Sequence, residues 1–308
     1  MRLIIDTDAG VDDAQAMMLA LADSEVTIEA ITTVTGNVHV NKVVPNVCTV
    51  LDMMKKEVPV YRGAQQPLLH TWHPEEDYHG SDGLGNWKER PSTNRQPQNE
   101  HAVQALIRLA NTYLGELTLI ALGPLTNLAL AIRLDPSFPG KIKQFVFMGG
   151  AITANGNTPN VTAEWNIYCD PEAAHIVLQA FPEATMLSWE TTLQHPFSWQ
   201  QCDELMELNS DAARFFTAIS ASTIEYFKRT SYSRGYLLPD PLAMAITLQP
   251  SLIKKMSAHY VAVELHGAYT RGQTVVDYAG TMGRKPNVQI VTEVDIDGVF
   301  KLFKQALA

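Results

Sequence analysis

Runs of apolar residues alternate along the chain with segments whose apolar residues recur at helical spacing. Residues 3–5 are apolar and mostly β-branched and lead into turn residues and Gly10, so they predict a buried strand. Helical spacing follows at once, in Ala14, Met17, Met18 and Leu21. Comparable strand-like runs lie at residues 26–34, 117–121, 145–148, 185–188 and 260–263. This alternation predicts an α/β fold with an open, mainly parallel (Rossmann-like) sheet, helices on both faces, and an active site at the carboxyl ends of the strands.

Three irregular segments interrupt this alternation. Residues 70–99 are rich in Pro, Gly, Asn, His and charged residues, so we expect a long surface excursion of the kind that forms lids. Residues 152–162 follow the end of a predicted strand, and residues 226–241 contain three tyrosines and Arg234. We expect the three segments to converge on the rim that holds Asp8, within a single domain of residues 1–308.

Composition excludes several classes of protein. With 46% hydrophobic and 18% charged residues, the chain is typical of a globular protein with a sizeable core. A formal net charge of −10 argues against nucleic acid as a partner. Met1-Arg2 leads directly into a predicted strand, and no apolar stretch is long enough for a membrane, so we expect a cytoplasmic protein. Cys48, Cys169 and Cys202 are too few and too far apart for a disulfide framework or a zinc cluster.

The most specific local pattern is a cluster of acids. Asp6, Asp8, Asp12 and Asp13 fall within eight positions between the first predicted strand and the first predicted helix. Carboxylates this dense repel one another unless a cation, a proton or solvent separates them, and a hard divalent ion that accepts oxygen ligands would explain them. The alternative is that Asp12 and Asp13 cap the helix while Asp6 and Asp8 are solvated turn residues.

Further polar motifs follow residues 6–13, here called the acid loop, in a specific order. They are Thr35-Gly36-Asn37, Gly123-Pro124-Leu125-Thr126-Asn127, Glu164-Trp165-Asn166, Cys169-Asp170-Pro171-Glu172-Ala173-Ala174, Pro239-Asp240-Pro241-Leu242 and Thr270-Arg271-Gly272-Gln273-Thr274-Val275-Val276-Asp277. In this order the set resembles the inosine-uridine type nucleoside hydrolases, calcium-dependent enzymes that cleave the N-glycosidic bond of ribonucleosides. The resemblance runs from Ile4 to the carboxyl terminus. It implies a homodimer or a homotetramer that acts on a small-molecule ribonucleoside, in nucleoside salvage.

The resemblance also implies roles for individual residues. It assigns Ca²⁺ to Asp8, Asp13, Asp240 and the main-chain carbonyl of Thr126. The expected catalytic residues are Asp8, as general base, and Asn37, which with Asp12 lies near the ribose 2′-hydroxyl and the attacking water. The remaining substrate contacts that it implies are Glu164 and Asn166 at the ribose 3′- and 5′-hydroxyls and Met148 at the pocket floor.

Two departures from the family pattern leave alternatives open. Many members have a histidine before the residue matching Asp240, thought to protonate the leaving base, but here Pro239 stands in its place. Replacements are sought among His79, which matches a family histidine near the base pocket, and Trp165, Tyr226, Tyr232, Arg234 and Tyr236. The segment before Glu164 is also one residue longer than the common family spacing, so either Asn157 or Asn160 could serve the 5′-hydroxyl, with Asn160 favoured.

Other readings of these motifs belong to different functional classes. Asp6-Thr7-Asp8 after a strand also resembles the opening of haloacid-dehalogenase-like phosphatases, which would use magnesium and an aspartyl-phosphate. A calcium-stabilised ribonucleoside- or ribose-binding protein with little turnover would carry the same sugar-binding residues. The glycine-rich residues 80–85 follow no predicted strand and lack Lys-Ser or Lys-Thr, so they do not predict a phosphate loop.

Overall fold

The strands form one sheet whose order places the acid loop near its centre. The computed structural model describes residues 1–74, 76–230 and 234–308. Within them, nine strands lie in the order β3-β2-β1-β4-β5-β6-β9-β7-β8. The strands are β1 (Arg2–Thr7), β2 (Thr27–Thr33), β3 (Val60–Arg62), β4 (Leu117–Ala121), β5 (Gln144–Met148), β6 (Ala184–Leu187), β7 (Ile253–Val263), β8 (Thr274–Asp277) and β9 (Val288–Val294).

The prediction of a mainly parallel sheet is confirmed. All neighbours from β3 to β9 pair in parallel, whereas β7 pairs antiparallel with both β9 and β8. The run predicted at 260–263 is only the carboxyl end of β7, which begins at Ile253. Its first half is exposed at Lys254 and Lys255 and therefore lacks the apolar signal of a buried strand.

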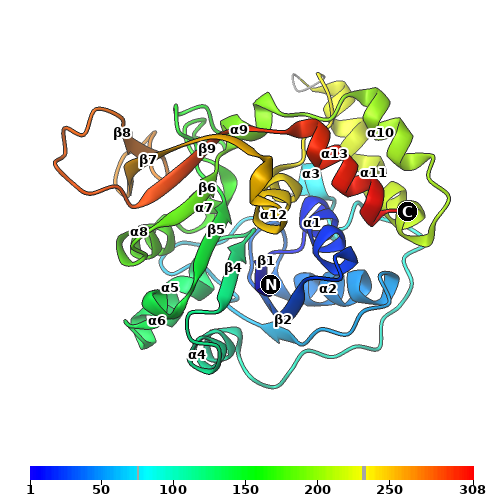
Figure 1. Ribbon diagram of the computed structural model, residues 1–308, viewed down its shortest axis with the longest axis horizontal. Helices are drawn as coiled ribbons and strands as arrows, with labels where there is room; N and C mark the ends of the chain where they lie inside the picture. Colours follow the sequence, from blue (N-terminus) through cyan, green and yellow to red (C-terminus); the bar gives the residue numbers. More distant parts are fainter. Residues whose placement is uncertain (75, 231–233) are drawn as a thin grey trace.

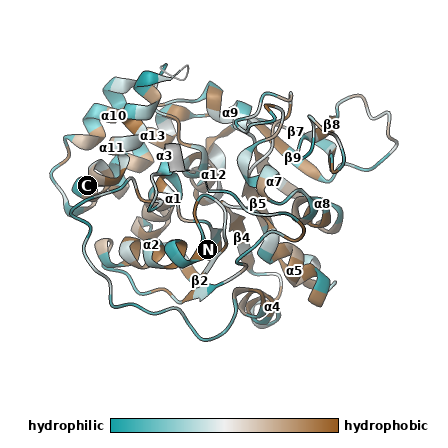
Figure 2. Cartoon of the chain, turned by 180° about the vertical axis from the view of Figure 1, so that it is seen from behind, coloured by the Kyte–Doolittle hydropathy of each residue, from teal (hydrophilic) through white to brown (hydrophobic). Residues whose placement is uncertain are grey.

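Helices cover both faces of the sheet, as the alternating pattern predicts (Figure 1). One hydrophobic cluster packs α1, α2, α11, α12 and α13 against the sheet, and the other packs α4, α5 and α8 against the opposite face. Many of these helices show both hydrophilic and hydrophobic residues along their length (Figure 2). The helices are α1 (Val11–Ala22), α2 (Val40–Met53), α3 (Glu76–His79), α4 (Ala102–Thr112), α5 (Thr126–Leu134), α6 (Phe138–Lys141), α7 (Trp165–Cys169), α8 (Pro171–Ala180), α9 (Trp189–Gln194), α10 (Trp199–Met206), α11 (Asp211–Arg229), α12 (Pro239–Leu248), α13 (Ile296–Ala306) and the 3₁₀ turn η1 (Pro250–Leu252).

The segment 70–99 is not wholly a surface excursion, which corrects the expectation from its composition. His79 and Leu84 within it are buried. Gly85 has a φ of +72°, and a Cβ there would lie 2.4 Å from the main-chain oxygen of Ile219 on α11. The glycines thus allow this segment to pack closely against a helix far away in the sequence.

No helix in the described parts of the chain is both long enough and apolar enough to cross a membrane.

Truncation of a core residue in the central strands is expected to destabilise the protein strongly. Leu119 on β4 is fully buried, so Leu119→Ala should lower the free energy of unfolding by about 2–5 kcal/mol through lost burial and an unfilled cavity. Leu114, which is 66% exposed, provides the control, and Leu114→Ala should change it by less than about 0.5 kcal/mol. Urea unfolding measures both, and equal losses in the two variants would contradict this account of the core.

Candidate active site

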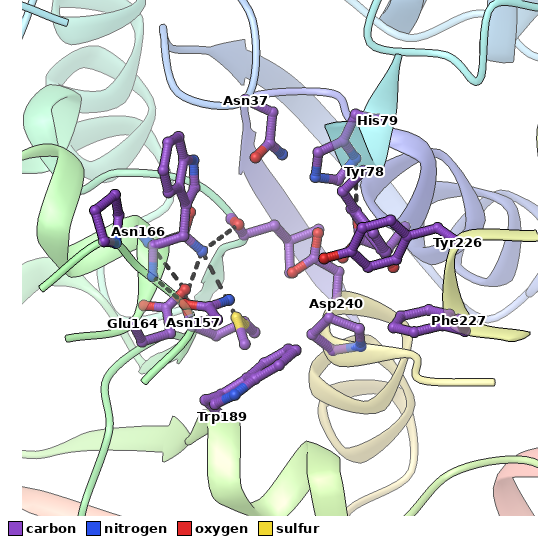
Figure 3. Close-up of a pocket in the computed structure, with 16 residues that line it drawn as sticks. Asn37, Tyr78, His79, Asn157, Glu164, Asn166, Trp189, Tyr226, Phe227 and Asp240 are labelled. Atoms are coloured by element: carbon purple, nitrogen blue, oxygen red, sulfur yellow. Dashed lines mark hydrogen bonds and ion pairs between the residues drawn. The ribbon is translucent and has the colours of Figure 1, made fainter. Parts of the chain in front are cut away.

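A cavity opens at the carboxyl edge of the parallel strands, where ligands bind in open α/β folds. Its volume is about 320 Å³, in the range of small-molecule sites. The loops after β1, β2, β4, β5 and β6 and the first turn of α12 contribute to its wall. It is lined by Asp12, Asn37, Tyr78, His79, Leu122, Met148, Asn157, Pro159, Glu164, Trp165, Asn166, Trp189, Tyr226, Phe227, Pro239 and Asp240 (Figure 3).

Four carboxylates gather at and beneath this cavity. Asp8, Asp12, Asp13 and Asp240 are all at least 95% buried, with exposed fractions from 0% to 5%. Ligand oxygens of Asp12, Asp13 and Asp240 lie within 4.8 Å of one another. The acids come together because α1 begins at Val11, directly after the acid loop, while α12 brings Asp240 from the other end of the chain.

The carboxylate of Asp8 packs directly against two glycines, Gly36 and Gly123, where a larger residue would clash with it. The main-chain N–H of Asn37 donates to Asp8 Oδ2 at 2.6 Å. A Cβ at Gly36 would lie 2.0 Å from the same oxygen, and one at Gly123 would lie 3.0 Å from the Asp8 carboxylate. The loops after β2 and β4 therefore close around Asp8 because both carry glycine at the contact.

Asp13 is oriented by its own loop. It accepts hydrogen bonds from the Thr7 hydroxyl and, at 2.9 Å, from the main-chain N–H of Gly10. The sequence analysis left open whether Asp12 and Asp13 only cap the helix. Both do lie in the first turn of α1, but Asp6 and Asp8, which that alternative placed in solvent, are fully buried.

Burial raises the pKa of each acid in this cluster. The largest cause for Asp8, Asp12, Asp13 and Asp240 is desolvation, which disfavours the charged form. Repulsion from Asp13 adds to it at Asp8 and Asp12. Asp8 Oδ1 and Asp12 Oδ1 have no hydrogen-bond donor among the described residues, and no lysine or arginine there forms an ion pair with the cluster. Unpaired, buried carboxylate oxygens of this kind suit a hard metal ion.

Thr126 is the other predicted metal ligand. It is buried at the first position of α5, and its hydroxyl donates to Asp170 Oδ2 at 2.7 Å. Asp170 in turn caps α8 by accepting from the N–H of Ala173. The side chain of Thr126 is thus committed to holding α5 against α8, so its main-chain carbonyl is the group left for a ligand role.

His79 is a neutral, oriented side chain at the cavity wall. Its Nδ1 accepts from the main-chain N–H of Val11 at 3.1 Å and lies 3.6 Å from Asp12 Oδ1. Burial lowers the pKa of His79 to about 3, so the imidazole stays neutral near pH 7. Because Nδ1 accepts a hydrogen bond, the hydrogen of the neutral ring resides on Nε2. His79 can therefore donate a hydrogen bond but does not carry a positive charge.

Asn157, Glu164 and Asn166 form one side of the cavity, the amide-rich side (Figure 3). Tyr78, Tyr226 and Phe227 lie on the other, the aromatic side. Asn166 Nδ2 donates to the main-chain oxygens of Leu122 and Met148, at 2.8 and 3.1 Å, which leaves its Oδ1 as an acceptor. Glu164 caps α7, and burial raises its pKa to about 7. Asn157 Oδ1 accepts from the N–H of Trp165 at 2.9 Å, which leaves its Nδ2 as a donor.

The structure separates the two asparagines that the sequence left as alternatives. Asn157 lines the cavity. Asn160, which the sequence analysis favoured, does not, because its Nδ2 donates to the main-chain oxygen of Arg271 and its Oδ1 accepts from Thr158. The geometry therefore favours Asn157 over Asn160.

Of the other residues predicted near the substrate, some line the cavity and others do not. Met148, Trp165 and Tyr226 line the cavity. Arg234 is exposed and lies outside the lining, so the structure does not bring it to the site. Tyr236 is fully buried away from it, hydrogen-bonded to Gln15 and Thr223. Tyr232 lies outside the described residues.

Sequence reasoning missed several residues of the wall. Tyr78 and Phe227 are the immediate neighbours of the predicted His79 and Tyr226. Leu122 and Trp189 come directly after or near the ends of β4 and β6, a position that itself signals the rim of a parallel sheet. Pro159 is the remaining addition, in the loop between Asn157 and Asn160.

Comparison with known proteins gives one consistent result. The family described as inosine-uridine preferring nucleoside hydrolase matches residues 3–301. The pyrimidine-specific ribonucleoside hydrolase RihA of Salmonella gallinarum is 34% identical over 99% of this chain and 97% of its own length. Among solved structures, an inosine-guanosine nucleoside hydrolase has a TM-score of 0.91 at 32% identity, covering 99% of this chain and 98% of its own. A purine-preferring ribonucleoside hydrolase from Gardnerella vaginalis has a TM-score of 0.91 at 30% identity, covering 100% and 98%.

The buried acids predict a stability that depends on pH and on metal. The pKa values of Asp6 and Glu164 are about 7 in the folded protein, against ordinary values of 3.8 and 4.5, so the folded state holds protons that the unfolded chain has lost. Without metal, Tm should therefore fall as pH rises from about 4 to beyond about 7. Calcium at about one hundred times its Kd should add about 2.7 kcal/mol near pH 8, several degrees of Tm, and less near pH 5 where the acids hold protons.

Thermal unfolding in chelator and in calcium measures both effects. The control is Asp240→Asn, which removes one carboxylate of the cluster and should abolish most of the response to calcium. A Tm that calcium leaves unchanged near pH 8, or an equal response in the variant, would contradict the assignment of a metal site to these acids.

Proposed function

Since this chain belongs to the inosine-uridine preferring nucleoside hydrolase family, it is an enzyme that hydrolyses the N-glycosidic bond of ribonucleosides, and we propose how its cavity carries out the reaction. The observation that carries the proposal is the buried cluster of Asp8, Asp12, Asp13 and Asp240 beside a cavity with one amide-rich and one aromatic side. Family membership also rules out the phosphatase alternative.

We propose that the amide-rich side binds ribose. Asn166 presents only an acceptor and Asn157 a donor, so a hydroxyl, which is both donor and acceptor, satisfies either. Glu164 and Asn166 then hold the 3′- and 5′-hydroxyls, with Asn157 also at the 5′-hydroxyl. Asp12 and Asn37 line the cavity and would contact the 2′-hydroxyl. Met148 lies at the floor beneath the sugar.

The acid cluster has the chemistry of a calcium site. Asp8, Asp13 and Asp240 with the Thr126 carbonyl would hold the ion, since these are hard oxygen ligands and calcium accepts six to eight of them at flexible geometry. When bound, calcium supplies a Lewis acid that orients water and lowers its pKa. Asp12 belongs to the same cluster as Asp13 and Asp240, and like Asp240 it lines the cavity. We assign it a substrate contact because the family resemblance places it at the ribose 2′-hydroxyl.

Asp8 is the proposed general base. Its Oδ2 accepts from the N–H of Asn37, and its Oδ1 has no donor among the described residues, so that oxygen would accept the proton of the attacking water. Cleavage of the bond between C1′ and nitrogen develops positive charge on the ribose ring. A buried, carboxylate-lined cavity stabilises this charge more than it stabilises the neutral substrate.

The aromatic side of the cavity fits the base. Tyr78, Tyr226 and Phe227 contact one another edge to face, with ring centroids 5.3 to 5.7 Å apart. His79 can donate a hydrogen bond to the leaving base from Nε2, but as a neutral ring it is a weak acid. Pro239, which lines the cavity in the place of the usual histidine, has no proton to give. Protonation of the leaving base is therefore the step for which this cavity offers the weakest acid.

The charge of the lining selects nucleosides over nucleotides. No lysine or arginine is among the described residues that line the cavity, whereas Asp12, Glu164 and Asp240 are. A 5′-phosphate would be placed beside carboxylates without a cationic partner, which is unfavourable.

We further propose that the enzyme is cytoplasmic, acts in nucleoside salvage and consists of one domain. Cys48 and Cys202 are buried thiols outside any disulfide, which is typical of a reducing compartment. One sheet joins strands from Arg2 to Val294, which supports a single domain over residues 1–308. The homodimer or homotetramer implied by the family stays a prediction.

Ribonucleosides should be hydrolysed far better than their 2′-deoxy counterparts. Loss of the 2′-hydroxyl leaves Asp12 and Asn37 without their proposed partner, which should reduce kcat/KM by about a hundredfold or more. Ribose release from inosine, uridine, cytidine, adenosine and guanosine, and deoxyribose release from 2′-deoxyuridine, measure this. Asp8→Asn is the control for catalysis and should lose nearly all turnover while still binding uridine.

Comparable kcat/KM for uridine and 2′-deoxyuridine would refute the proposed ribose contacts. Binding of uridine without release of ribose by the wild-type protein would instead support a nucleoside-binding protein.

A substrate whose leaving group needs no protonation should be hydrolysed faster than inosine. Because Pro239 replaces the usual proton donor, p-nitrophenyl riboside should have a kcat at least about tenfold higher, since general-acid catalysis is typically worth a factor of about a hundred. Steady-state kinetics on both compounds decide. Equal kcat values would mean that another donor acts, and His79→Ala and Tyr226→Phe would then identify it.

A further inference from the structure

The acid loop contains a buried residue in a strained conformation. Ala9, between Asp8 and Gly10, has a φ of 38° and is fully buried. L-amino acids with a side chain rarely adopt this region, and such a conformation persists only where its surroundings fix it. Here the main-chain N–H of Ala9 donates to Thr7 Oγ1 at 3.0 Å, and the Ala9 carbonyl accepts from Asn46 Nδ2 at 3.0 Å.

Asn46 also reaches the segment that carries His79. It is fully buried on α2, and its Nδ2 donates to the main-chain oxygen of Asp82 at 3.0 Å as well as to Ala9. Gly83, with a φ of +78°, would place a Cβ 2.9 Å from the same nitrogen. The glycine-rich residues 80–85 therefore have a structural purpose, because they let the chain after His79 come close to this amide.

The orientation of the Asn46 amide is fixed from its other end. Its Oδ1 accepts from Arg90 at 2.6 Å, and the rest of that guanidinium donates to Thr49 Oγ1 at 2.9 and 3.1 Å. Arginine only donates, so the oxygen of Asn46 must face it. Both amide hydrogens are then committed, one to the acid loop and one to the His79 segment.

We propose that Asn46 is a positioning residue that holds the acid loop and the His79 segment in a fixed relation. Asn46 touches neither the proposed substrate nor the proposed metal. It fixes the Ala9 peptide, and with it the directions of Asp8 and of the turn that donates to Asp13 and His79. The role of Asn46 in catalysis rests on the function proposed above. That Asn46 links the acid loop to the His79 segment does not, because it follows from the hydrogen bonds alone.

Asn46→Asp tests the proposal because it keeps the size of the side chain and the acceptor for Arg90 but turns the two donations into contacts between oxygens. We expect kcat/KM for a ribonucleoside to fall at least about tenfold, since small misplacement of reacting groups is costly. Calcium affinity, measured by titration calorimetry, should weaken by a similar factor. Hydrogen exchange without metal should become faster in residues 8–13 and 79–86 together.

Thr49→Val is the matched control on the same helix. It removes the hydroxyl that accepts from Arg90 and leaves both donations of Asn46 intact. It should therefore lower Tm while kcat/KM, calcium affinity and exchange in the two segments stay within about twofold of wild type. Where Asn46→Asp yields too little folded protein, Asn46→Ala serves with the same expected direction. Adding Ala9→Gly should restore part of the lost kcat/KM, because glycine accepts a positive φ unaided.

Two outcomes would overturn the proposal. One is an Asn46 variant that loses only thermal stability, with wild-type kcat/KM and exchange in the folded fraction. The other is an equal loss in Thr49→Val, which would point to general loosening of α2. If the wild-type protein released no ribose, the proposed function would fail, whereas the exchange measurement would still decide whether Asn46 couples the two segments.

Discussion

The rest of the site depends on the burial of four like charges at one point. Asp8, Asp12, Asp13 and Asp240 are removed from water and lack a cationic side chain from the described residues. Desolvation raises the pKa of each, and repulsion between carboxylates adds to it at Asp8, Asp12 and Asp240, so the cluster favours either protons or a metal ion. Because such burial is unfavourable in itself, the surrounding loops have to hold the acids in place.

Those loops hold the acids mainly through the backbone. The N–H groups of Asn37 and Gly10 bind Asp8 and Asp13, and the glycines at 36 and 123 allow the approach. On the opposite wall, the main-chain oxygens of Leu122 and Met148 fix the amide of Asn166. Polar groups held in this way are oriented before substrate arrives, which reduces the free energy spent on reorganisation during the reaction.

Fold and base preference are separate properties in this family. A relative named pyrimidine-specific and a structure named purine-preferring are 34% and 30% identical to this chain, each over nearly its whole length. Membership of the family is therefore compatible with either base preference. The part of the cavity that we propose for the base comes from α3 and the end of α11, which pack on each other through Tyr78, Tyr226 and Phe227.

The sequence alone determined the architecture and located the dense acids of residues 6–13, whereas Asp240 was predicted only through the family resemblance. Buried parallel strands are short apolar runs separated by helical periods, and four carboxylates within eight positions are visible in the sequence itself, so both signals are local. Tertiary structure decided which candidates meet. Asn157 and Asn160 are equivalent by composition, but only the side chain of Asn157 reaches the cavity, because Asn160 binds the carbonyl of Arg271, 111 residues away. Asn46 shows no local signal either, since its role depends on contacts with Ala9 and Asp82, 37 and 36 residues distant, that exist only once the chain has folded.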